Sequence, residues 1–234
     1  MKRLSTRALA ALTNTFLVCI VLVIGAVCFL PSVSAASGVD DRVYYRGNAS
    51  DGVSLMINVY WGTELLDGFL EVLDEYGAKA TFFLGGSWAD DNVSTVKKIA
   101  EKGHEIASHG YFHREHDKLN LQENREEIKT SVDFISLASG QKVKLFAPPS
   151  GAYNDFTIEA AESLGLKTIM WSKDTIDWRD KDTNLCFRRA TENVTGGDFI
   201  LMHPMEHTLK ALPKILEHYQ KIGLFPITVS DNIG

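Results

Sequence analysis

From residue 52 onward, short apolar runs alternate along the chain with longer segments whose apolar residues recur at helical spacing. The apolar runs are short, too continuous for half-exposed strands, and bounded by turn or capping residues. We therefore predict buried β-strands at residues 53–59, 80–84, 105–108, 144–147, 167–171, 199–203 and 226–229.

The segments between these runs predict helices. Residues 64–76 carry their apolar side chains on one helical face, and Gly77 ends that segment. Asn120 and Glu123 have the spacing of a capping box at the start of another helix. Further helices are expected at residues 93–102, 155–164, 183–194 and 209–222, and Pro213 leaves the start of the last one open.

Alternation of strands and helices with short loops is typical of right-handed βαβ units and a parallel sheet. Seven strands over residues 52–234 predict an α/β fold, a (β/α)7-type barrel that is distorted or incomplete. An open doubly wound sheet is the alternative. No internal repeat or linker interrupts this region, so it is expected to form one domain.

The first 36 residues have the pattern of a targeting segment. Lys2, Arg3 and Arg7 precede an apolar stretch that runs, with one polar interruption, to Leu30. Small residues at 33–35 fit signal-peptidase cleavage, whereas the length of the stretch also suits a retained membrane anchor. Either alternative places the domain outside the cytoplasmic membrane. Residues 37–51 are interpreted as a polar lead-in and residues 52–234 as the domain.

Charge and cysteine content narrow the possible partners. The formal net charge of −6 leaves no basic face for nucleic acid, so a nucleic-acid partner is not expected. Cys186 has no second cysteine in residues 52–234 with which to form a disulfide. We interpret it as a small buried side chain on a helix.

Polar and ionisable residues follow five of the predicted strands, at the carboxyl ends where parallel α/β folds gather their functional groups. We therefore expect one rim to carry these residues together: Asn58, Tyr60, Trp61, His109, His113, the segment 147–151, Asp174, Asp177, Trp178 and His203.

The residues around each histidine predict different roles for them. His109 and His113, four residues apart, could present two imidazole nitrogens to one divalent ion, with zinc first by ligand type, or could be surface residues. His104-Glu105 lacks the spacing of a zincin motif, so His104 is interpreted as structural. His116 is expected to be solvated.

His203 ends an apolar strand, where a buried imidazole needs a partner. Asp177 is the candidate to orient this ring and to hold it protonated. A histidine–carboxylate pair of this kind is the arrangement that a general acid requires.

These motifs and their order resemble those of the NodB-homology polysaccharide deacetylases, carbohydrate esterase family 4. "HGYFH" (109–113), "DTIDW" (174–178) and "LMH" (201–203) match the second, fourth and fifth family motifs, with Gly110 where a hydroxyl residue is usual. The stretches "YYRGN", "YWG" and "FAPPSGAYN" are most similar to the sporulation-associated branch of the family.

The resemblance implies metal-assisted hydrolysis of an acetamide. His109 and His113 would hold zinc or another divalent transition metal, His203 would be the general acid, and Asp177 would tune it. It further implies a group of substrate-binding residues: Trp178, Leu201, Tyr60 and Pro149.

Two motifs depart from the family pattern. Asn58 stands at the position of the catalytic base and cannot accept a proton near neutral pH. Tyr60 stands at the expected position of the carboxylate ligand, where a phenol binds a metal more weakly. Ala147 replaces the arginine that normally contacts the base.

The resemblance therefore predicts a metal-dependent N-deacetylase of cell-wall polysaccharide, acting on peptidoglycan amino sugars, with a link to sporulation and with weakened or altered catalysis. The alternative is a non-catalytic glycan-binding or structural cell-wall protein on the same fold. Both share an N-acetylated glycan partner, attachment to or secretion across the membrane, and a location at the cell wall or spore envelope.

Overall fold

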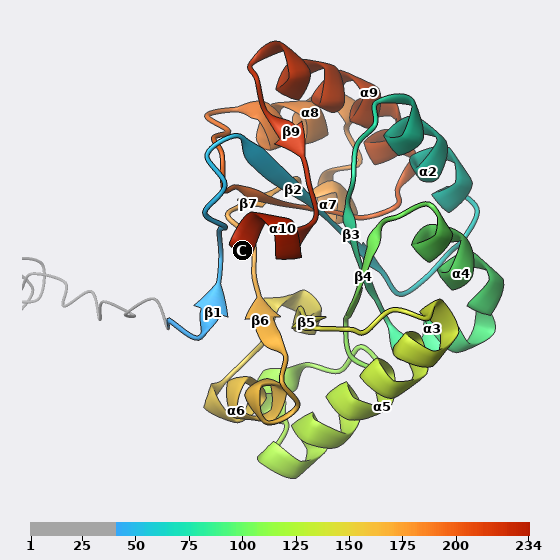
Figure 1. Cartoon of the computed structure of the whole chain (residues 1–234), viewed down its shortest axis with the longest axis vertical. Coiled ribbons are helices and arrows are strands. Elements are labelled where there is room, and N and C mark those ends of the chain that lie inside the picture. Colours follow the sequence, from blue (N-terminus) through green and yellow to red (C-terminus); the bar gives the residue numbers. More distant parts are fainter. Residues whose placement is uncertain (1–40) are drawn as a thin grey trace, which may run out of the picture. The chain divides into compact units, whose positions relative to one another are not determined.

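The computed structural model of the chain describes residues 41–234 (Figure 1). The predicted signal peptide or anchor at residues 1–36 lies outside the described residues. Between Asp41 and Gly234, none of the helices has both the length and the apolar character needed to cross a bilayer.

A parallel sheet forms the centre of the fold. Its strands, in the order in which they lie side by side, are β1 (Val43–Tyr44), β6 (Lys167–Ile169), β5 (Leu145–Phe146), β4 (Glu105–Ser108), β3 (Thr81–Leu84), β2 (Gly52–Val59), β8 (Phe199–Met202) and β7 (Lys173–Asp174), while β9 (Phe225–Pro226) pairs with β2. Every pairing between these strands is parallel, and β1 and β7 end the order without pairing to each other. The prediction of an incomplete α/β barrel is therefore confirmed.

Most of the helices cover the outside of the sheet, whereas α10 (Val229–Ile233) lies across one end of it and packs Val229 and Ile233 into the inner cluster (Figure 1). The helices are α2 (Leu66–Glu75), α3 (Gly86–Asp91), α4 (Val93–Glu101), α5 (Leu121–Ser139), α6 (Asp155–Ser163), α7 (Asp177–Asp180), α8 (Thr183–Thr191), α9 (Glu206–Lys221) and α10, with 3-10 turns at His116–Lys118 and Pro149–Gly151. Asn120 and Glu123 form both hydrogen bonds of the predicted capping box at the start of α5.

Several short elements were not predicted from the hydrophobic pattern, or were predicted with other bounds. Strands β1 and β7 have two residues each, too few to show a periodicity. The predicted strand at 226–229 ends early because the Thr228 side chain accepts a hydrogen bond from the Asp231 amide and caps α10. Helix α9 begins at Glu206 and continues through Pro213, since packing against its neighbours outweighs one missing hydrogen bond.

The side chains of strand β2 alternate between the helix-covered face of the sheet and its inner face, where the functional residues lie. Its alternate residues Leu55, Ile57 and Val59 pack into the large apolar cluster under the helices. Met56 faces the other way, into a smaller cluster inside the sheet. The same alternation places Asn58, two residues further on, on the inner face at the carboxyl end of the strand.

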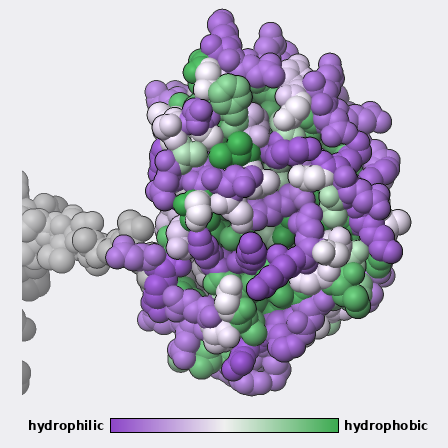
Figure 2. Space-filling model, viewed as in Figure 1, coloured by the Kyte–Doolittle hydropathy of each residue, from purple (hydrophilic) through white to green (hydrophobic). Residues whose placement is uncertain are grey.

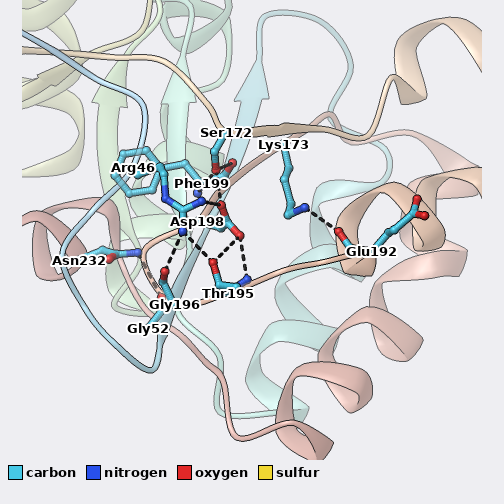
Figure 3. A network of polar contacts seen from close by, with 10 residues as sticks. All are labelled: Arg46, Gly52, Ser172, Lys173, Glu192, Thr195, Gly196, Asp198, Phe199 and Asn232. Carbon is cyan, nitrogen blue, oxygen red and sulfur yellow. Dashed lines mark hydrogen bonds and ion pairs between the residues drawn. The ribbon is translucent and has the colours of Figure 1, made fainter. Parts of the chain in front are cut away.

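The segment before β2 is joined to the domain by a buried carboxylate (Figure 3). Asp198, which is 1% exposed, accepts from Arg46 at 2.7 Å, from Ser172 Oγ at 2.7 Å and from the Thr195 amide at 2.8 Å. Arg46 also donates to Thr195 Oγ1 and to the Gly196 carbonyl. This network holds the lead-in against the loop that precedes β8.

We expect Arg46→Ala to lower the free energy of unfolding by about 1–2 kcal/mol, because Asp198 then keeps a buried charge with fewer donors, and because solvent screens the half-exposed arginine. Urea denaturation measures this change. Lys98→Ala, which removes the exposed ion pair with Asp67, is the control and should leave the midpoint unchanged. Equal effects of the two substitutions would contradict the assignment.

Candidate active site

A cavity of about 290 Å³ opens at the carboxyl ends of the strands. The side chains that line it are Asn58, Tyr60, His109, His113, Ser150, Trp171, Asp174, Trp178, Leu201 and His203. They come from the ends of β2, β4, β6, β7 and β8, from the loop after β5 and, for Trp178, from α7. The side chains expected from the sequence to share one rim therefore do so in the structure.

His203 and Asp177 form the pair predicted from the sequence. Asp177 Oδ1 accepts from His203 Nδ1 at 2.8 Å, and Oδ2 accepts from the His203 amide at 2.7 Å and from Thr208 Oγ1 at 2.8 Å. Burial raises the pKa of Asp177, but the hydrogen bonds and charge of His203, together with Thr208, more than offset this, so its pKa lies below the ordinary value. With Nδ1 engaged, Nε2 is the ring nitrogen of His203 left for a ligand.

His109 is fully buried, and both of its ring nitrogens have partners. Nδ1 lies 2.8 Å from the Ala147 carbonyl, which can only accept, so Nδ1 carries the proton. Burial, and then the neighbouring His113, lower the pKa of His109 well below its ordinary value, so the ring is neutral. Its Nε2 lone pair therefore accepts from the Asn58 amide nitrogen, 3.4 Å away. Asn58 Oδ1 points away from that contact and is buried without a hydrogen-bond partner.

His113 is covered by Tyr60. The two rings stack with centroids 3.6 Å apart, and the His109 ring lies 5.0 Å from that of His113. Burial lowers the pKa of His113. Its backbone has φ of 55°, a left-handed conformation that is uncommon for residues other than glycine, although asparagine, aspartate and histidine adopt it more often than the rest. Ser150 and Ile176, in two other segments around the cavity, share this conformation, as is frequent at functional sites.

The donor set does not fit the metal centre that the family resemblance implies. That centre needs a carboxylate beside the two imidazoles, and across residues 41–234 no three histidine, cysteine, aspartate or glutamate side chains gather as a metal site. The Asn58 amide nitrogen, a donor, faces the His109 nitrogen that a metal would need. Tyr60 covers one face of the other imidazole. The residues present therefore do not form the metal site that the resemblance implies.

Asp174 is the carboxylate among the residues that line the cavity. Its Oδ1 accepts from the Ile176 amide at 2.7 Å, which shapes the turn before Asp177. Burial, and to a lesser extent the charge of Asp177, raise the pKa of Asp174 above its ordinary value. Glu64, Asp90 and Asp91, the carboxylates that follow in the sequence after Asn58 and the next strand, do not line the cavity and so cannot replace the base there.

Aromatic rings form much of the cavity wall. Trp178 is 50% exposed and, with Trp171 and Leu201, presents an apolar surface to a ligand. The Trp61 ring stacks on that of His203 at 5.8 Å between centroids. Exposed aromatic side chains beside polar groups are well suited to bind the apolar faces of sugar rings.

Of the lining residues, Trp171 was not predicted, and Ser150 was expected at the rim only as part of the segment 147–151. Ser150 lies in the "APPSG" segment, whose position after a strand was the available signal. Trp171 was assigned to the end of a strand and therefore to the core. Pro149, the residue predicted from that segment, is buried and does not line the cavity; its ring lies near Gly110.

The prediction that His116 is solvated is wrong. The residue is 0% exposed, and its Nδ1 donates to Asn124 Oδ1 at 2.6 Å. Burial lowers the pKa of His116 to about 4, so it is neutral. Its other nitrogen lies 3.0 Å from the position that a Cβ at Gly110 would take, and Gly110 has φ of 73°. The loop between His109 and His113 is therefore packed on a buried histidine, and glycine fits best at 110.

Two further interpretations are confirmed. His104 is buried, and its Nδ1 accepts a hydrogen bond from the Ala80 amide, a structural role. Cys186 is buried on α8, and burial raises the pKa of its thiol to about 12.

Comparisons with known proteins agree with this geometry. A sequence model of the family described as polysaccharide deacetylase matches residues 47–169. YlxY of Bacillus subtilis is 35% identical over 86% of this chain, and the peptidoglycan-N-acetylglucosamine deacetylase PgdA of Listeria monocytogenes is 31% identical over 71%. The chain spans 63% and 35% of the lengths of these two relatives.

Among solved structures, a CE4 family pseudoenzyme from Bacillus anthracis superimposes with a TM-score of 0.80 at 34% identity, covering 82% of this chain and 69% of the other. A mutant of that pseudoenzyme with restored enzymatic activity superimposes equally well, with a TM-score of 0.80 at 32% identity, covering 82% of this chain and 71% of the other.

Proposed function

The chain belongs to the polysaccharide deacetylase family, and we propose that it recognises N-acetylated amino-sugar polymer of the bacterial cell wall with its hydrolytic step strongly weakened. The observation that carries this proposal is the contact between Asn58 and His109. It puts an amide where the family has a base, and a hydrogen-bond donor against the imidazole nitrogen that would bind a metal.

Recognition of glycan is supported by the parts of the site that remain. The cavity retains an apolar wall at Leu201 and Trp178, and an imidazole at His203 whose Nε2 is left to contact a ligand. The similarity to a peptidoglycan-N-acetylglucosamine deacetylase supports an N-acetylated sugar as the ligand.

Weak hydrolysis follows from the groups that are absent. A positioned general base typically contributes about 10²–10⁴-fold to a rate, and the amide of Asn58 cannot accept the proton of an attacking water. The phenol of Tyr60 is no substitute near neutral pH, since burial raises its pKa above the ordinary value. The acid side of the reaction is present at His203, which Asp177 orients, while the base side is missing.

Residual deacetylation is the second candidate function, and the preserved His203–Asp177 pair favours it. Acetate release from N-acetylglucosamine oligomers, measured with zinc or cobalt added, separates the two. Binding without acetate under any metal supports recognition alone, whereas metal-dependent acetate supports residual turnover.

We expect Trp178→Ala to weaken binding of N-acetylglucosamine oligomers about tenfold, because loss of an aromatic stacking surface together with its buried area amounts to roughly 1.4 kcal/mol. Isothermal titration calorimetry measures the change. Phe225→Ala is the matched control, since this aromatic side chain is 57% exposed and lies outside the cavity. Unchanged affinity in Trp178→Ala, or equal loss in both variants, would argue against glycan binding at this cavity.

The location of the protein is part of the proposal. The basic residues and apolar stretch before Pro31 support a domain held outside the cytoplasmic membrane, by a retained anchor or after secretion. The similarity of "YWG" and "FAPPSGAYN" to the sporulation-associated branch supports a role at the spore envelope. Cell fractionation of vegetative and sporulating cultures tests both.

A further inference from the structure

A second cavity, of about 320 Å³, lies at the amino ends of the strands, opposite the candidate active site. It is lined by Lys142, Lys144, Leu145, Gly165, Lys167, Ser230 and Gly234. Three of these seven residues are lysines, and no aspartate or glutamate side chain is among them. In a chain with a net charge of −6, these lysines form a basic cluster, although an adjoining hollow that shares Lys142 and Lys144 also contains Glu105 and Asp231.

The position of this cavity follows from the strands around it. Lys144 precedes β5, and Lys167 is the first residue of β6. Helix α10 covers the same end of the sheet, because the Val229 amide donates to Thr81 Oγ1 at the start of β3. Figure 1 views this end, with α10 in front of the strands, and Figure 2 shows that much of this face is hydrophilic.

The three lysines are available to a ligand. None of them forms an ion pair with another residue in the range 41–234; the Lys167 ammonium lies 5.1 Å from the centre of the Tyr44 ring. Three ammonium groups around one concave surface match the oxygens of a phosphate ester. Lys142 and Lys144 are exposed, so a ligand on a surface can reach them.

The path of the chain before β1 indicates that the phosphate belongs to a membrane lipid. Strand β1 runs parallel to β6, with Val43 opposite Thr168, so the residues before β1 enter at the same end as Lys167. About ten residues separate Asp41 from the predicted apolar stretch, and a chain of that length spans at most about 36 Å. A membrane anchor in that stretch would keep the lysine cavity within reach of the bilayer surface.

We propose that the cavity of Lys142, Lys144 and Lys167 binds the phosphate headgroups of anionic lipids. This contact would turn the amino end of the sheet toward the membrane and the candidate active site, at the other end, toward the wall. The proposal rests on the membrane anchor proposed above, but not on glycan recognition, since none of its residues lines the active-site cavity.

The test uses the full chain in lipid bilayer discs that contain phosphatidylglycerol or only phosphatidylcholine. Lysine acylation, followed by mass spectrometry, should be slowed at least threefold at the three lysines in phosphatidylglycerol discs, and high salt should abolish this protection. Lys97, Lys129 and Lys214, exposed on α4, α5 and α9, should react equally in both discs. Equal acylation of the three cavity lysines in the two lipids would overturn the proposal.

A variant pair makes the test independent of lysine chemistry. Amide hydrogen exchange of α10 should slow in phosphatidylglycerol discs for the wild type and for K97E/K129E/K214E, but not for K142E/K144E/K167E. Loss of the effect in both triple variants would overturn the assignment to this cavity. Protection of the cavity lysines by glycerol phosphate in phosphatidylcholine discs, to the same extent as by the anionic lipid, would overturn the lipid as ligand and indicate a site for free phosphate esters.

Discussion

Replacing Asn58 and Tyr60 together with aspartate is expected to raise acetate release from N-acetylglucosamine oligomers by about 10²–10⁴-fold in the presence of zinc or cobalt. A carboxylate at position 58 would supply the missing base, and a carboxylate at position 60 would lie beside the two imidazoles. Both positions line the cavity with His109 and His113, so the substitutions add groups where the reaction needs them.

The physical reason is that each substitution also removes an obstacle. In the wild type, the Asn58 amide occupies the lone pair of His109, and the Tyr60 ring covers His113. A carboxylate at 58 cannot donate to His109, and the shorter side chain at 60 uncovers His113.

Two measurements distinguish the effect of the added base at position 58 from that of the added metal ligand at position 60. Isothermal titration with zinc should show tighter binding by N58D/Y60D than by the wild type, whether or not the enzyme turns over. N58D/Y60F is the matched control, because it restores the base but keeps a ring over His113 and adds no carboxylate ligand. If N58D/Y60D neither binds zinc more tightly nor releases acetate, the assignment of these two positions is wrong.

Removing the carboxylate of Asp177 is expected to have the largest effect on stability. Asp177→Ala leaves the His203 amide, the His203 ring and the Thr208 hydroxyl without their common acceptor. Breaking a buried pair in this way costs about 3–5 kcal/mol, which corresponds to a melting temperature lower by roughly 6–20 °C for a domain of this size. Differential scanning calorimetry measures the shift.

The effect of Asp177 should depend on pH. Its pKa in the folded protein is lower than in the unfolded chain, so the carboxylate adds stability above the unfolded pKa of about 3.9 and loses it as the pH falls through the folded pKa. The difference in unfolding free energy between the wild type and Asp177→Asn should therefore be constant near neutral pH and shrink below about pH 4. A difference that grows on acidification would contradict the lowered pKa.

Thr208→Val is the graded control for this network. It removes one of the three donors to Asp177 and keeps the side-chain shape, so we expect a loss of about 1–2 kcal/mol. An equal loss in Thr208→Val and Asp177→Ala would show that packing, rather than the carboxylate, determines the effect.

Much of the fold could be predicted from local patterns, because each strand and helix carries its own signal. The apolar run at 53–59 and the Asn120–Glu123 cap are readable without tertiary contacts, and both are present in the structure. The short strands β1 and β7 could not be found this way. They exist because a neighbouring strand supplies hydrogen-bond partners, and two residues contain no periodicity.

The sequence by itself determined which chemical groups are available. These are two histidines at 109 and 113, an aspartate at 177 with a histidine at 203, and an amide at 58 in place of a carboxylate. Only the tertiary structure decided what these groups do to one another. Asn58 and His109 are 51 residues apart, and the buried His116 is hydrogen-bonded to Asn124 of α5. Such contacts depend on the register of parallel strands and on the packing of helices over them, neither of which a local pattern encodes.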